Sequence, residues 1–205
     1  MARGKREFVV VMVLALTLSA APQSATAEST EDPPPVTGSS PAADAVVAQP
    51  WAVEVTGGFF LESWDMNQFR EQLLGGAVSL YRQVSPRWAL GVETHMLHVN
   101  QTPARNVFMP ALCMMVRWSA LERGQTSVFV EGGAGPAYAS HRVPDHGTQF
   151  NIVAQTGVGL SRQLTSRVDM LRGARWVHVS NNGLDGSWRN PDIQALGLYL
   201  GWRLH

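Results

Sequence analysis

The chain has 205 residues, of which 16 are basic and 16 acidic, and 45% of its residues are hydrophobic. Without residues 1–27, which have the features of a secretory signal, 13 basic and 15 acidic residues remain, so the sequence offers no strongly basic face for nucleic acid. The single cysteine, Cys113, excludes an intramolecular disulfide and a cysteine-based metal cluster.

The N-terminal segment is predicted to be an export signal. Three basic residues (Arg3, Lys5 and Arg6) precede an apolar run at 8–21, and Ala-Thr-Ala at 25–27 fits a cleavage site. The apolar run, about 14 residues, is shorter than the roughly 20 that a membrane-spanning helix needs. Residues 28–50 are rich in Pro, Ser and Ala and lack an apolar period. We therefore expect a disordered periplasmic leader, followed by one domain at 51–205.

Alternation at period two dominates the domain at 51–205. In the stretch 192–204, one face is large and apolar, and the other is small or polar. The large set is Leu196, Leu198, Leu200, Trp202 and Leu204. The stretches 88–96 and 150–162 alternate in the same way. Such a pattern is typical of the wall of a membrane β-barrel, whereas a helix would scatter these residues around its circumference.

Eight alternating runs are each close to the length that a tilted strand needs to cross a bilayer. They lie at about 51–60, 72–83, 88–98, 107–118, 126–136, 150–162, 167–177 and 192–203. The connections at 84–87, 119–125 and 163–166 are shorter, and those at 61–71, 99–106, 137–149 and 178–191 are mostly longer. The predicted fold class is therefore all-β, an eight-stranded antiparallel transmembrane β-barrel with short periplasmic turns and longer outer loops.

A soluble lipocalin-like barrel is the competing interpretation, because period two does not distinguish inside from outside. Two features favour lipid on the outside. The small residues suit the narrow interior of an eight-stranded barrel. In addition, Trp88, Trp118 and Trp202 fall near the periplasmic strand ends, as an aromatic belt would. We expect a multi-pass protein of the outer membrane of a Gram-negative bacterium, although such barrels usually end in an aromatic residue and this chain ends in Arg-Leu-His.

Charged residues on the small-residue faces are predicted to form an interior network of ion pairs and hydrogen bonds. They are Glu54, Glu93, Glu131 and Arg117. Histidines near the outer ends have no fixed mutual geometry, so no metal site is predicted from His95, His98, His141 and His146. Arginines of the outer loops fall near the level of lipid phosphates, as phosphate ligands or as solvated charges; they are Arg70, Arg105, Arg142 and Arg189.

The candidate chemistry lies at 176–184, which reads Trp-Val-His-Val-Ser-Asn-Asn-Gly-Leu. His178 and Ser180 close a strand, where side chains at i and i+2 share a face with Cα atoms about 6.5 to 7 Å apart. The imidazole can therefore reach the hydroxyl. Asp192, at the start of the returning strand, can reach the other ring nitrogen. Taken alone, the spacing favours a hydrogen-bonded polar strand end over catalysis.

The run from His178 to Leu184, with Asp192 where the family carries its acid, resembles the lipid A 3-O-deacylase family. The resemblance is sharpest over 176–202. It implies an outer-membrane eight-stranded barrel that removes the ester-linked acyl chain at position 3 of lipid A. The resemblance implies a glutamate as the family's acid, and the side chain of Asp192 is one methylene shorter. Asp185 is the alternative acid.

The resemblance implies a serine esterase in which His178 takes the proton of Ser180 and Asp192 orients the imidazole. Asn181 and the amide of Gly183 are candidate oxyanion donors. We expect no cofactor and no metal. The expected partners are lipid A or lipopolysaccharide and outer-membrane lipids, without nucleic acid, and a homodimer is left open. The rival functions are a non-catalytic structural barrel, and a lipid A acyltransferase or phospholipase of similar barrel type.

The parity of the strands predicts which way the site faces. Asp192 shares the parity of Leu196 and Leu198, and His178 shares that of Trp176. If the parity persists to the rim, the site opens on the outer wall, and a lipid of the outer leaflet can present its ester sideways. A β-bulge at 181–182 would reverse the faces.

Overall fold

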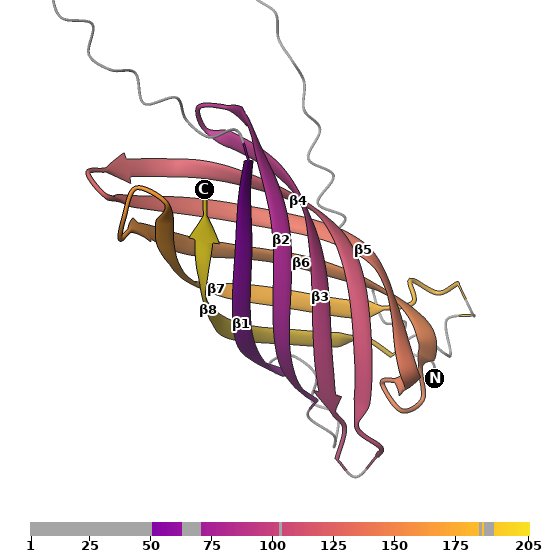
Figure 1. Cartoon of the computed structure of the whole chain (residues 1–205). Helices are drawn as coiled ribbons and strands as arrows, with labels where there is room; N and C mark the ends of the chain where they lie inside the picture. The colour runs from indigo at the N-terminus through magenta and orange to yellow at the C-terminus, as the bar shows by residue number, and fades with distance from the viewer. Residues whose placement is uncertain (1–50, 63–70, 103, 185, 187–190) are drawn as a thin grey trace, which may run out of the picture. The chain divides into compact units, whose positions relative to one another are not determined.

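The computed structural model describes residues 51–62, 71–102, 104–184, 186 and 191–205, which form a closed antiparallel β-barrel (Figure 1). The strands are β1 (Trp51–Glu62), β2 (Gln72–Ser85), β3 (Trp88–Asn100), β4 (Val107–Arg123), β5 (Thr126–Val143), β6 (Thr148–Gln163), β7 (Val168–Ser180) and β8 (Ile193–Leu204). Each strand pairs with the next, and β8 pairs with β1. The predicted signal and leader, at 1–50, lie outside the described residues. The described residues include no helix that is long and apolar enough to cross a membrane.

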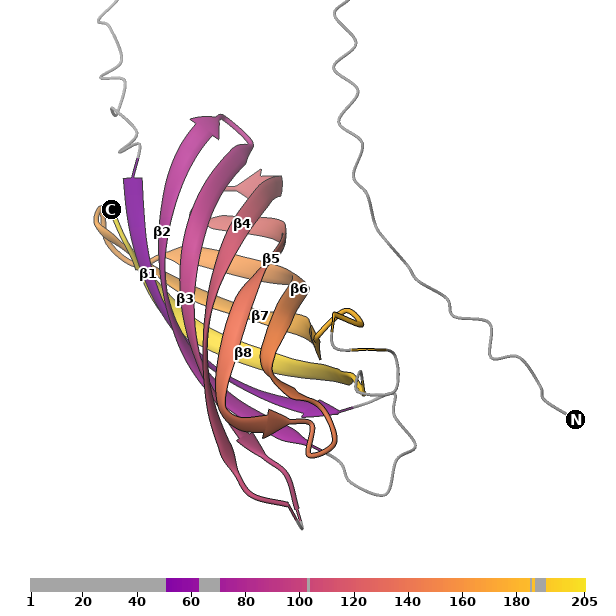
Figure 2. The same cartoon turned by 90° about the vertical axis from the view of Figure 1, so that its right-hand side faces the viewer.

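The starts and ends of the strands divide between the two ends of the barrel. The start of β1 and the end of β8 lie at the same end as the turns that follow β2, β4 and β6 (Figures 1 and 2). Gly124, at a φ of 58°, allows the β4–β5 turn to close between Arg123 and Thr126. The opposite end carries the last residues of β1, β3, β5 and β7 and the first residues of β2, β4, β6 and β8 (Figures 1 and 2). This arrangement confirms the predicted eight-stranded topology.

The outer wall of the barrel is apolar, as the alternation predicts. All five large residues assigned to the outer face of β8 are exposed, with Leu198 at 71%. Their neighbours Ala195 and Tyr199 face inward and are buried. A closed barrel leaves no unpaired strand edge, and an apolar wall without edges is what a lipid bilayer can solvate. The assignment of inside and outside is therefore confirmed.

Aromatic side chains mark both ends of this wall. Trp118 and Trp202 are exposed near the end that carries the short turns, and the Trp88 and Trp118 rings lie 6.4 Å apart. Exposed Phe108, Tyr138 and Phe150 mark the other end. On β4, Trp118 and Phe108 are ten residues apart. At a strand tilt of about 40°, this separation corresponds to about 25 Å along the barrel axis, the height of the apolar band of outer-membrane barrels.

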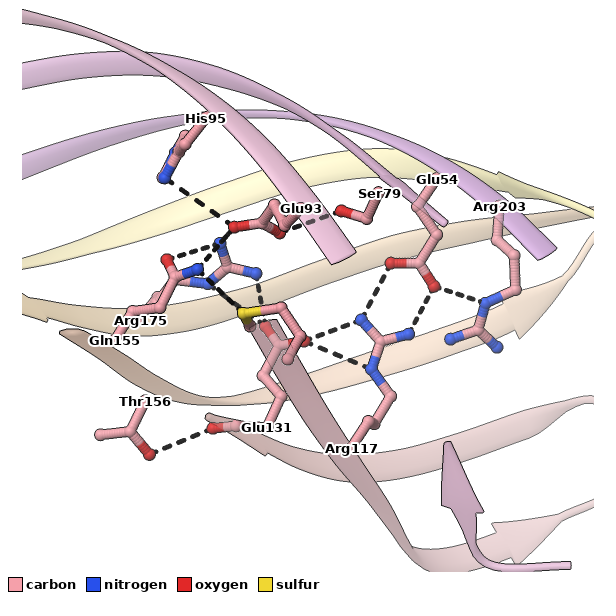
Figure 3. A network of polar contacts seen from close by, with 11 residues as sticks. Glu54, Ser79, Glu93, His95, Arg117, Glu131, Gln155, Thr156, Arg175 and Arg203 are labelled. Carbon is pink, nitrogen blue, oxygen red and sulfur yellow. Dashed lines mark hydrogen bonds and ion pairs between the residues drawn. The ribbon is translucent and has the colours of Figure 1, made fainter. Parts of the chain in front are cut away.

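The predicted interior network is confirmed (Figure 3). Arg117 donates to both carboxylate oxygens of Glu54 and, at 2.7 Å, to Glu131. The other Glu131 oxygen accepts from Arg175 at 2.7 Å, and Arg175 also donates to Glu93 at 3.0 Å. Each of these side chains is buried. The three carboxylates and two guanidiniums therefore pair with one another across the lumen, from β1 through β4 and β5 to β7 and β3.

Aromatic rings and small residues complete the packing of the interior. The Arg117 guanidinium lies over the rings of Tyr81 and Phe129, at 4.1 and 4.2 Å, and Arg175 lies over Tyr199 at 4.8 Å. A Cβ on Gly159 would come within 2.3 Å of the Phe129 ring. Glycine is therefore required there, because the lumen of eight strands has no further room beside that ring.

Some predicted loop boundaries are wrong. The loop expected at 137–149 is mostly strand, since β5 continues to Val143 and pairs with Thr148 at the start of β6. The turn expected at 119–125 shrinks because β4 continues to Arg123, past a register irregularity between Ser119 and Leu121. A bulge interrupts the alternation on which the prediction relied, so the continuing strand was read as a turn.

Candidate active site

Strand β7 carries His178 and Ser180 at its outer end, at the same end of the barrel as Phe150. The pairing of β6 with β7 runs without a register shift from Gln163–Asp169 to Ile152–Ser180. The pairing of β7 with β8 is also unbroken, and it places Trp176 opposite Leu196 and His178 opposite Gln194. Directly paired residues point to the same face. Because Leu196 faces outward, His178 does so as well, and the predicted opening on the outer wall is confirmed.

The three residues singled out in the sequence lie together. His178 Nε2 is 3.0 Å from Ser180 Oγ, and His178 Nδ1 is 3.6 Å from Asp192 Oδ2. The serine is 6% exposed, whereas the side chains of His178 and Asp192 are 26% and 38% exposed. The first distance is that of a hydrogen bond, and the second is slightly longer than one. The arrangement is compatible with a nucleophile, a base and an orienting acid.

Two side chains that the sequence did not identify contact this group. The Trp176 ring stacks on the imidazole, with ring centroids 5.6 Å apart and an interplanar angle of 18°. Gln194 Nε2 donates a hydrogen bond of 2.8 Å to Asp192 Oδ2. Trp176 and His178 are two residues apart on one strand, so the spacing that identified Ser180 could have identified this stack. The contact of Gln194 depends on the pairing register, which the sequence does not specify.

The chain turns sharply after the serine. Leu184 N donates to Asn181 O, and the central residues Asn182 and Gly183 have φ values of 53° and 74°, as in the turns that asparagine and glycine favour. The buried Asn181 side chain donates to Thr148 Oγ1 at 3.2 Å and accepts from Gly183 N at 2.9 Å. Both candidate oxyanion groups therefore also stabilise the turn.

The site lies close to the outer ring of aromatic residues. Ser180 pairs with Ile152, two residues along β6 from Phe150, and Phe150 pairs with Tyr138. Two residues correspond to about 6.6 Å along a strand. The hydroxyl therefore lies near the outer boundary of the apolar wall.

The remaining candidates do not join this group. His95 is buried in the lumen, with Nδ1 3.8 Å from Glu93, whereas His98 is exposed on the outer wall. Within the described residues, no three His, Cys, Asp or Glu side chains form a group that could hold a metal. The Nη1 atom of Arg105 lies 2.8 Å from Nε2 of His141, near the outer end of β5, and Arg142 is exposed. Asp185, Arg70 and Arg189 lie outside the described residues.

Comparisons with solved structures agree with the barrel. The chain is similar to neisserial surface protein A, with a TM-score of 0.58, 13% identity, and coverage of 76% of this chain and 97% of that one. It is also similar to the outer-membrane enzyme PagL, with a TM-score of 0.52, 16% identity, and coverage of 74% of this chain and 99% of that one. At these identities the likeness concerns the fold.

The family comparison is more specific. No curated protein is significantly similar to the chain in sequence. The homodimer that the sequence left open finds no support in the structural similarities. The family of the lipid A 3-O-deacylase PagL matches residues 87–203, which are more than half of the chain and include His178, Ser180 and Asp192. The chain is therefore an outer-membrane β-barrel that belongs to the lipid A 3-O-deacylase family.

Proposed function

We propose that this protein hydrolyses the ester-linked acyl chain at position 3 of lipid A, with Ser180 as the nucleophile, His178 as the general base and Asp192 as the acid that orients the imidazole. The observation that carries the proposal is the grouping of these three side chains on the outer wall, beside the outer aromatic ring. The family match gives the substrate class.

The geometry supports an acyl-enzyme mechanism. His178 Nε2 accepts the proton of Ser180 as Oγ attacks the ester carbonyl, and Asp192 stabilises the resulting imidazolium. The tetrahedral intermediate collapses when the imidazolium gives its proton to the oxygen of the departing sugar. A water molecule, activated by the same imidazole, then releases the fatty acid and regenerates Ser180. The side chains present provide every proton transfer.

The oxyanion of the tetrahedral intermediate needs hydrogen-bond donors close to Ser180. Asn181 and the amide of Gly183 are the proposed donors because they follow the serine directly in the turn. Both engage each other in the turn, and the Asn181 amide also contacts Thr148. Substrate therefore has to replace one of these contacts. Hydrogen bonds of a catalytic site commonly take their final form only when substrate is bound.

Substrate access follows from the orientation of the wall. The lumen is closed by buried ion pairs, of which Glu131 with Arg117 and Arg175 is the centre. A lipid with several chains cannot enter an interior this narrow. Directly opposite His178, the outer wall carries the small residue Ala154, which does not obstruct the imidazole as a large side chain would. The ester therefore approaches from the outer leaflet while the acyl chains stay in the membrane.

The first prediction tests the proposal with the substitutions Ser180→Ala and His178→Ala. Each removes a group required for chemistry, so each lowers the rate of fatty-acid release by about 10³-fold or more, while the barrel still folds. Mass spectrometry of lipid A from cells that express each variant measures the loss of one hydroxyacyl chain. Near-normal turnover by either folded variant would contradict the assignment.

The same measurement separates the rival functions. Gain of an acyl chain on lipid A indicates an acyltransferase, and loss of a chain from glycerophospholipids instead indicates a phospholipase. Unchanged lipids in the presence of folded wild-type protein indicate a structural barrel. We also propose export with removal of residues 1–27, and N-terminal sequencing of the protein from outer membranes tests this, because the mature chain should then begin at Glu28.

A further inference from the structure

Gln194 lies directly opposite His178 in the β7–β8 ladder and points to the same outer face. Its Nε2 donates a hydrogen bond of 2.8 Å to Asp192 Oδ2. The same carboxylate oxygen lies 3.6 Å from His178 Nδ1. One oxygen of Asp192 therefore faces both the glutamine amide and the imidazole.

The position of Asp192 explains why it needs such a contact. Asp192 precedes Ile193, where β8 begins, and its side chain is 38% exposed. It lies two residues before Gln194, on the face of the sheet that His178 shares. Its Cα is therefore about 6.6 Å along the strand from the level at which Gln194 and His178 pair. Within the described residues, no other side chain donates a hydrogen bond to it. Without a donor, the exposed carboxylate would rotate towards water.

The chemistry of the amide suits this task. An ionised carboxylate only accepts hydrogen bonds, and the glutamine amide supplies a donor that carries no charge. A lysine or arginine at this place would neutralise Asp192 and weaken its stabilisation of the imidazolium. A glutamine fixes the carboxylate and leaves its charge available to His178.

We infer that Gln194 is a positioning residue that holds the Asp192 carboxylate against the imidazole of His178. The inference rests on the proposed function to the extent that Asp192 acts through His178. Gln194 does not touch the ester, so its influence on the rate passes through Asp192.

A double-mutant cycle tests this inference with the substitutions Gln194→Met, Asp192→Ala and both together. Methionine has a similar length and no donor. Gln194→Met should lower kcat about tenfold, a factor expected from loss of a hydrogen bond to a charged group, and leave KM within about twofold. In the Asp192→Ala background, the same substitution should have no further effect, since the carboxylate that it positions is absent.

A matched control and a second readout make the result specific. Gln72 is an exposed glutamine at the outer end of β2, and Gln72→Met should leave kcat unchanged.

The rate at which a fluorophosphonate labels Ser180 reports the reactivity of the hydroxyl without any lipid A. It should fall in Gln194→Met and not fall further in the double variant. If the labelling rates of the wild type and the variants follow this pattern but the wild-type protein releases no acyl chain from lipid A, the positioning inference holds and the proposed substrate is wrong.

Three results would overturn the inference. Gln194→Met could leave both kcat and the labelling rate unchanged. It could lower them equally with and without Asp192, which would mean that Gln194 acts independently. Finally, Gln194→Glu replaces the donor with a carboxylate of the same shape and should lower kcat. An increase would show that the acid belongs at position 194 rather than at Asp192.

Discussion

Among single residues, Asp192 makes the loosest contact of the proposed triad, at 3.6 Å from the imidazole. Asp192→Asn removes the charge that stabilises the imidazolium, and we expect kcat to fall by about 10² to 10⁴-fold. Asp192→Glu keeps the charge and adds one methylene, which can shorten the gap. We expect it to retain at least about ten times the kcat of Asp192→Asn. Release of fatty acid from purified lipid A measures both, and a harmless Asp192→Asn would move the role of the acid to Asp185.

Asn181 offers a second prediction at this scale. Asn181→Ala removes both the proposed oxyanion donor and a clamp of the turn, and we expect kcat to fall by about 10² to 10³-fold. Thr148→Val is the control, since it removes the contact of 3.2 Å between Thr148 and the Asn181 amide, and the hydrogen bond of 2.7 Å from Thr148 Oγ1 to Phe150 O, but keeps the Asn181 side chain. We expect it to change kcat by less than about tenfold. Equal losses in the two variants would assign Asn181 to the turn alone. Steady-state release of acyl chains at saturating lipid A distinguishes these cases.

The residues of the site were predictable to different degrees. His178 and Ser180 were accessible because a spacing of two residues in a strand places them on one face. Asp192 lies twelve positions beyond Ser180, at the start of the returning strand, and the resemblance favoured it over Asp185. Gln194 was not accessible, because its role depends on which residue of β7 lies opposite it, and strand register is a property of the paired sheet.

At the scale of elements, the alternation in the sequence predicted the number of strands and which side chains face outward. It did not predict where the strands end. The ends of β5 and β6 were misplaced because the two strands extend each other through the pair Val143 and Thr148. The end of β4 was misplaced because the register shifts between Ser119 and Leu121. Pairing with a neighbour decides where a strand ends, and that information is not local in the sequence.

The wall between β6 and β7 yields a prediction about substrate approach. Ala154 lies opposite His178 and faces outward, so Ala154→Phe would place a ring in the space beside the imidazole. We expect kcat/KM to fall by about tenfold or more. The barrel should still fold, since the ring replaces a small side chain on the lipid-facing wall. Thr94→Phe, on the outer wall of β3, is the control and should retain full activity. Loss of activity in the control as well would mean that added bulk disturbs the whole barrel.

At the scale of the whole molecule, the closed barrel separates the structural charges from the reactive ones. The network of Glu54, Arg117, Glu131 and Arg175 lies in the lumen, and the proposed site lies on the outer wall. The alternation along the strands predicted that the carboxylates and Arg117 lie in the lumen. It did not predict the role of Arg175, because a buried arginine is recognised by the carboxylates around it, which come from β3 and β5.

Glu131→Ala tests this separation. Glu131 is buried and accepts hydrogen bonds from Arg117 and Arg175, so its removal leaves two cations facing each other in the closed lumen (Figure 3). Breaking a buried ion pair by removing one partner commonly destabilises a protein by about 3 to 5 kcal/mol. We expect a loss of this size in the free energy of unfolding, measured by urea titration of tryptophan fluorescence in lipid vesicles.

The exposed carboxylate of Glu122, near the β4–β5 turn, provides the matched control. Glu122→Ala should change the free energy of unfolding by less than about 0.5 kcal/mol, because solvent screens that charge. The folded fraction of Glu131→Ala should release acyl chains at a rate within about twofold of wild type, since in the described part of the chain Glu131 contacts Arg117, Arg175 and Thr156 and not the proposed triad. A large loss of kcat in fully folded Glu131→Ala, without a comparable loss in Glu122→Ala, would instead couple the lumen to the outer wall. In that case the interior charges would take part in holding β7, and with it His178 and Ser180, in the reactive geometry.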